Sequence, residues 1–102
     1  MVRFLVMYQQ PTDVDAFEQH YRDVHIPLAK GLPGLRRYAV SRNVRPVRGE
    51  AQFYLVAELE WDDMESLRRD FASPDGRATA ADVETLAQWS AVQSMIYEPE
   101  DV

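Results

Sequence analysis

The chain has 102 residues, of which 46% are hydrophobic and 27% charged, and its formal net charge is −6 at pH 7. This acidic balance argues against a nucleic-acid-binding protein, because phosphate backbones are bound by Lys and Arg. The absence of cysteine excludes disulfides and thiolate chemistry, and no apolar run reaches the roughly 20 residues that span a bilayer, so we expect a cytoplasmic protein without a membrane partner.

A strand and a helix open the chain. Residues 3–9 alternate in a strand pattern that is apolar on both faces. Thr12 or Asp13 can cap the helix that follows. Pro27 should loosen the last turn, because its ring clashes with the carbonyl group four residues back, and Gly31 is a reasonable end. One apolar stripe at steps of three and four comprises Val14, Phe17, Tyr21, Val24 and Leu28.

Two strands, two helical segments and a last strand follow. The patterns predict strands over residues 35–43 and 53–61. Asp62 is expected to cap a short helix and Ser73 a second helical segment. The final strand covers residues 89–97. The third strand has an apolar face of Phe53, Leu55, Ala57, Leu59 and Trp61, and a mixed face of Tyr54, Val56, Glu58 and Glu60.

This order, β-α-β-β-α-β, is that of the ferredoxin-like split βαβ arrangement. Residues 1–102 then form a single α+β domain, in which the helices cover one face of a four-stranded antiparallel sheet. The other face is too apolar to remain in water, and a second copy is the simplest cover. We therefore expect a homodimer, a dimeric α+β barrel with a cavity between its two sheets. The residues expected on the bare face are Tyr8 or Met7, Tyr38, Tyr54 and Val56.

Several segments resemble the EthD family, in the expected order and over nearly the whole chain. They are YRDVHIPL at 21–28, LPGLRRY at 32–38, AELEWD at 57–62, SPDGR at 73–77 and ADV at 81–83. The resemblance implies a dimeric α+β barrel, close to methylmuconolactone isomerases, aromatic polyketide cyclases and cofactor-free monooxygenases. In the methylmuconolactone isomerases, the residues that match His25 and Tyr38 are linked to lactone binding.

His25 is the main catalytic candidate, because a neutral imidazole can accept or donate a proton near neutral pH. The alternative is a half-buried histidine bonded to a carbonyl group in the turn loosened by Pro27. His20 lies five residues away, roughly 140° around an ideal helix. The two rings therefore should not share a metal ion, and we expect no metal site and no cofactor, although a single histidine could still be a haem ligand.

Five other residues are candidates for substrate binding. The hydroxyl of Tyr38 could orient a carbonyl or carboxylate, or its ring could cover the dimer seam. Arg36, on the same strand, could attract an anionic substrate or simply carry solvated charge. Tyr54 and Glu58 share the mixed face, where Glu58 is either a partly desolvated acid or base or an ion-pair partner of an arginine, Arg36 or Arg42. Tyr21 of the helix stripe completes the set.

Two functions remain open. The first is a cofactor-independent enzyme of the isomerase, cyclase or oxygenase type, which acts on a lactone, an aromatic or a polyketide-like compound. The second is a non-catalytic, ligand-binding accessory dimer that supports another enzyme system. Polar groups that converge on a ligand-sized void would favour the enzyme, whereas a void filled by side chains would favour the accessory protein.

Overall fold

Four antiparallel strands form one sheet in the order β2-β3-β1-β4. The computed structural model describes residues 1–102. The elements in chain order are β1 (Val2–Tyr8), α1 (Val14–His20), the π-helical turn η1 (Tyr21–His25), α2 (Ile26–Lys30), β2 (Leu35–Ser41), β3 (Leu55–Trp61), α3 (Met64–Ala72), α4 (Pro74–Ala87) and β4 (Val92–Tyr97). The predicted α+β, ferredoxin-like architecture is confirmed, and the predicted strand ends lie within three residues of the observed ones.

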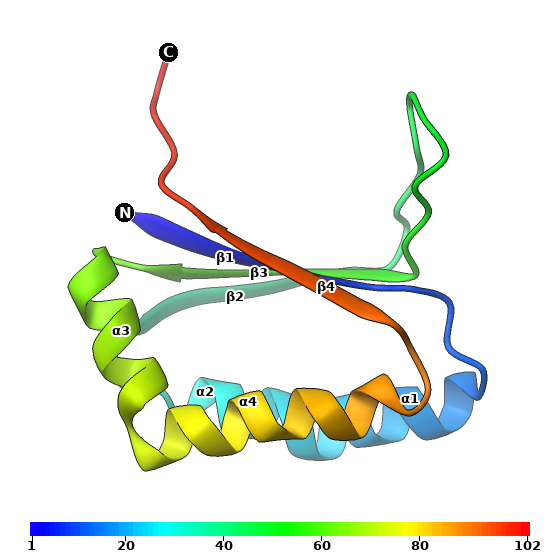
Figure 1. Ribbon diagram of the computed structural model, residues 1–102, viewed down its shortest axis with the longest axis horizontal. Helices are drawn as coiled ribbons and strands as arrows, with labels where there is room; N and C mark the ends of the chain where they lie inside the picture. The colour runs from blue at the N-terminus through cyan, green and yellow to red at the C-terminus, as the bar shows by residue number, and fades with distance from the viewer.

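All helices lie on one side of the sheet (Figure 1). α4 runs beneath the sheet next to the continuous helix made by α1, η1 and α2, and α3 closes one end. The loop over residues 42–54 and the C-terminal residues 98–102 both rise on the opposite side. No helix combines the length and the apolar character that crossing a membrane requires.

The core lies between the helices and the covered face of the sheet. β1 contributes its even-numbered residues and β3 its odd-numbered ones, as strand alternation requires. Tyr8 and Tyr38 pack in or against this core, so their predicted place on the bare face is wrong. The buried members are Val2, Val6, Tyr8, Phe17, Tyr21, Ala29, Leu32, Leu55, Ala57, Leu59, Trp61, Leu67 and Leu86.

The face of the sheet that the helices leave open is partly apolar and partly charged. At one end, Glu60 accepts a 2.9 Å hydrogen bond from Arg3 Nε and lies 3.6 Å from a terminal nitrogen of Arg37. The register places Met7 opposite Val56 on this face, as predicted. The apolar members are Leu5, Met7, Ala39, Val56 and Met95.

The helix caps follow from short polar side chains. Asp13 accepts a 3.1 Å hydrogen bond from the backbone of Ala16, and Ser73 Oγ accepts one of 3.0 Å from Gly76. The predicted cap Asp62 is wrong, because its neighbour Asp63 takes that position at the start of α3.

Gly76 permits a close approach of α4 to the preceding helix. A Cβ atom at Gly76 would lie 1.9 Å from the carbonyl oxygen of Asp70. At Gly31, where φ is −78°, the nearest atom to a Cβ would be a carbonyl oxygen at 3.3 Å.

We predict that Gly76→Ala lowers the free energy of unfolding by about 1–3 kcal/mol or more, because backbone must move to admit the methyl group. Gly31→Ala, the matched control, should change it by no more than about 1 kcal/mol. Urea denaturation followed by tryptophan fluorescence measures both. Equal stabilities of the two variants would contradict the close contact between α3 and α4.

Candidate functional site

A cavity of about 220 Å³ lies between the sheet and the helices of a single chain. Twelve of its 17 lining residues are hydrophobic, so it suits a mostly apolar ligand. Both walls of this cavity come from the same copy, so it is distinct from the cavity expected between the two sheets of a dimer. Polar groups in the lining come from three tyrosines that are among the twelve hydrophobic residues, Tyr8, Tyr21 and Tyr38, and from His25, Thr79, Glu84 and Ser94.

A wide helical turn brings His25 into this cavity. The N–H of Ile26 donates to the carbonyl of Tyr21, five residues back, which is the hydrogen bond of a π-helix. Pro27 follows directly, and it lacks the N–H that an α-helical bond to residue 23 would need. The loosening expected near Pro27 is therefore observed, and it takes the form of this extra residue in the preceding turn.

The wide turn changes which residues face the core. Phe17, Tyr21, His25 and Ala29 are all buried, at a constant spacing of four. The sequence pattern instead placed Val24 in the apolar stripe, but 39% of Val24 is exposed. His25 therefore lies in the buried stripe and not at its edge.

His25 is 6% exposed and is held at one ring nitrogen. Its Nδ1 lies 2.9 Å from Oδ2 of Asp82, and its ring stacks on Tyr21 with the ring centres 5.3 Å apart. Nε2 has no partner within the protein, and every fully buried side-chain nitrogen and oxygen atom does have one. Nε2 is therefore not fully enclosed by protein, and the ring that carries it lines the cavity.

His20 and His25 share a carboxylate, contrary to the predicted separation around an ideal helix. His20 Nε2 lies 2.8 Å from Oδ1 of Asp82, while His25 binds the other oxygen. The π-turn between the two histidines brings residues that are five apart onto one side of the helix. The structure has no group of three or more His, Asp or Glu side chains placed to hold a metal ion.

Burial lowers the pKa of His25 below its ordinary value of 6.5, and the hydrogen bond to Asp82 opposes part of this effect. The ring is therefore neutral at pH 7, with a lone pair available as a base. Because the folded pKa is lower than that of the unfolded chain, the unfolded chain takes up the proton first as the pH falls. The contribution of His25 to stability is thus complete above about pH 6.5 and is lost below it.

Two tyrosine hydroxyls in the same cavity lining as His25 are hydrogen-bonded to each other. Tyr21 and Tyr38 are 2.6 Å apart through their oxygens, and both rings line the cavity. Burial raises the pKa of Tyr38 to about 12, against an opposing effect of its hydrogen bond to Tyr21. It raises the pKa of Tyr21 further. Both hydroxyls thus remain protonated, and when Tyr21 donates to Tyr38, the proton of Tyr38 is free to reach a ligand.

Three of the predicted site residues, Arg36, Tyr54 and Glu58, lie outside the cavity. Arg36 binds Asp62, with nitrogen–oxygen distances of 2.8 and 3.0 Å. Tyr54 bends towards the helices, where its hydroxyl donates to Glu18, so it does not share a face with Glu58. Arg42 is paired with the same Glu18.

Glu58 lies on the open face, opposite Leu5 and Ala39 of the neighbouring strands. It makes no ion pair, so the predicted pair with Arg36 or Arg42 is wrong. The sheet itself separates Glu58 from the cavity, so Glu58 cannot reach a ligand there.

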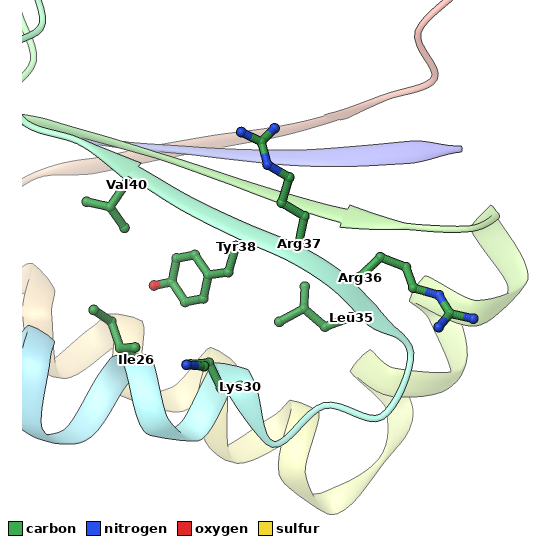
Figure 2. A pocket seen from close by; sticks show the side chains of 7 residues that line it. All are labelled: Ile26, Lys30, Leu35, Arg36, Arg37, Tyr38 and Val40. Atoms are coloured by element: carbon green, nitrogen blue, oxygen red, sulfur yellow. The ribbon is translucent and has the colours of Figure 1, made fainter.

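A second hollow, an outer groove of about 300 Å³, runs between β2 and α2. Figure 2 shows Tyr38 on the helix side of β2, while Arg37 rises from the opposite side and Arg36 points away past the strand end. The groove is larger than the cavity but has neither the histidine nor a second tyrosine. Tyr38 lines both hollows and so lies between them.

Sequence reasoning missed Asp82, Tyr8 and Glu84. Asp82 belongs to the ADV segment, whose pattern indicates no role for it, and it lies 57 residues from His25 along the chain. Tyr8 was assigned to the wrong face as an alternative to Met7; it is 1% exposed and lines the cavity. No pattern in the sequence points to Glu84.

Comparison with known proteins gives one family match and several similar structures. The model of the EthD domain matches residues 9–90. An uncharacterised 11.0 kDa protein of the thcB–thcC intergenic region of Rhodococcus erythropolis is 31% identical over 101 residues, which cover 99% of this chain and 96% of that protein.

Two of the similar solved structures differ in how much they share with this chain. An EthD family protein of Bacillus halodurans is 36% identical, with a TM-score of 0.83 over 98% of this chain and 99% of the other. SnoaB of Streptomyces nogalater, a cofactor-independent oxygenase, is 20% identical, with a TM-score of 0.67 over 99% and 94% of the two chains. At that identity, SnoaB shares the fold alone.

Proposed function

The chain belongs to the EthD family, and from that premise we propose that it is a cofactor-independent enzyme that removes a proton next to a carbonyl group. His25 is the base, and Tyr38 donates a hydrogen bond to the oxygen on which negative charge develops. Isomerases, cyclases and oxygenases that work without a cofactor can all begin with this step. Lactones, aromatic compounds and polyketide-like compounds can all lose a proton in this way.

One observation carries the proposal: polar groups converge on a void of ligand size. Nε2 of His25 has no partner in the protein, and the hydroxyls of Tyr21 and Tyr38 lie in the same lining. An accessory protein would need no unpartnered base next to a pair of hydroxyl donors. The cofactor-independent oxygenase with the same fold is consistent with this chemistry.

The size of the cavity limits the substrate to one or two rings. A volume of about 220 Å³ exceeds the roughly 150 Å³ of an apolar cavity that accepts benzene. It falls below the roughly 300 Å³ at which pockets for drug-sized ligands begin.

The charges of the cavity favour a neutral substrate. The cavity lining contains Glu84 but no Lys or Arg. The carboxylate of Asp82 lies behind the His25 ring, bound to its Nδ1. An anionic ligand would lose its hydration there without gaining a cation. The anionic substrate that Arg36 suggested is therefore replaced by a neutral ring compound that carries a carbonyl group.

The proton transfer can be tested with β-tetralone, a neutral two-ring ketone. Its acidic C–H bond breaks, the proton goes to His25 Nε2, and the electron pair forms an enolate held by Tyr38; exchange of the His25 proton with D₂O then returns a deuteron to carbon. We predict that the protein accelerates deuterium incorporation, measured by NMR. His25→Gln should lower the rate about 100-fold or more, and Tyr38→Phe about 10- to 100-fold, because one donor to the developing charge is lost.

Tyr97→Phe is the matched control. Tyr97 lies opposite Arg3 on the neighbouring strand, on the open face, so the sheet separates it from the cavity. It should exchange at the wild-type rate. Exchange by His25→Gln at the wild-type rate would remove His25 from the mechanism.

The open face of the sheet supports a homodimer. In a single copy, Met95 is 50% exposed and Leu5, Ala39 and Val56 are partly exposed, and the same face of a second copy would cover them symmetrically. The loop over residues 42–54 and the C-terminal residues rise on this side, where they would flank a second sheet (Figure 1).

We predict that Leu5→Glu converts the dimer to a monomer, because it places a carboxylate among the apolar residues of this face, where a second copy would remove the water around the charge. Sedimentation at micromolar concentration measures the mass. Val24→Glu, an equivalent change on the outer surface of the helices, should leave the dimer intact. A monomeric wild-type protein would contradict the pairing of the two sheets.

A further inference from the structure

Asp82 links the buried helix stripe to α4. The side chain extends from α4 and is 10% exposed, and its two oxygens bind the two histidines that flank the π-turn. The distances are 2.8 Å to His20 Nε2 and 2.9 Å to His25 Nδ1. A carboxylate held at both oxygens has little freedom to rotate, so it fixes the plane of the His25 ring.

The hydrogen bond also determines where the His25 proton lies. An ionised carboxylate only accepts hydrogen bonds, so Nδ1 of His25 must carry the hydrogen. In the neutral ring, Nε2 is then the nitrogen with the lone pair, and it is the one without a protein partner in a ring that lines the cavity. The reverse tautomer would place a hydrogen on Nε2 and leave the ring unable to act as a base there.

His20 restrains the carboxylate from the other side. Its side chain is 22% exposed, against 8% for His25, and its ring lies 5.8 Å from that of Trp89. His20 is too far along the helix to line the cavity, and it is absent from the cavity lining. Its one contact with the site is through Oδ1 of Asp82.

We propose that Asp82 and His20 are positioning residues of the site: Asp82 fixes the tautomer and orientation of His25, and His20 fixes Asp82. This inference rests on the proposed role of His25 as the base. The π-turn is what makes the arrangement possible, because an ordinary helix would turn the two rings roughly 140° apart.

The test uses Asp82→Asn, His20→Gln and His20→Ala in the full chain, with Asp75→Asn, an exposed carboxylate of the same helix, as the matched control. Long-range ¹⁵N–¹H correlation spectra report the tautomer of His25, and β-tetralone exchange reports kcat and KM. In Asp82→Asn, we expect a substantial fraction of the Nε2–H tautomer and a fall in kcat of about 100-fold or more with KM little changed. His20→Ala should lower kcat about 3- to 10-fold, whereas His20→Gln, which keeps a donor to Asp82, should restore most of the rate.

Each outcome separates the two proposals. If wild-type protein catalyses exchange and His25→Gln does not, but Asp82→Asn retains both the wild-type tautomer and the rate, the positioning role is overturned while the base remains. If no exchange occurs in the wild type but Asp82→Asn still shifts the tautomer, the proposed function fails and the positioning of the ring stands. Should Asp82→Asn not fold, Asp82→Ser, which removes the carboxylate without adding volume, gives the same comparison of the tautomer.

Discussion

The site depends on five residues of π-helix, Tyr21–His25, within an otherwise α-helical segment. The wide turn rotates His25 into the buried stripe and brings His20 to the same side, so that one carboxylate from a distant helix can bind both rings. Without that extra residue, the stripe would continue through Val24, and the cavity would have an apolar wall in place of a base. Pro27 gives a local reason for the turn to form at this position.

The charges of the molecule are arranged so that the cavity stays free of cations. Three arginines near the β2 strand are bound elsewhere: Arg36 to Asp62, Arg37 to Glu60, and Arg42 to Glu18. What remains in the cavity is a neutral imidazole and tyrosine hydroxyls whose protons are retained through burial. Such a set can take a proton from a neutral compound and stabilise the resulting oxyanion in surroundings of low dielectric constant.

The sequence patterns predicted the elements well, because alternation in the strands and caps such as Asp13 and Ser73 are local signals. They also singled out His25 and Tyr38, through the segments that resemble the family. Which face of the sheet each side chain occupies was harder to predict. Tyr38 and Val40 form the apolar side of β2 and pack against the core, whereas the sequence pattern placed Tyr38 on the open face. Asp82 could not be assigned a role, because its contacts with the histidines depend on a turn that helical periodicity does not reveal and on residues about 60 positions away.

The state of one ring tests the account most directly: the protonation of His25 in the wild-type protein, followed by ¹⁵N NMR of the imidazole over a pH titration. We predict a midpoint below 6.5 and, at pH 7, a neutral ring with hydrogen on Nδ1 and none on Nε2. The spectrum of His20→Gln assigns the two histidines. An imidazolium at pH 7, or a neutral ring with its hydrogen on Nε2, would contradict the account, because no base would then face the cavity.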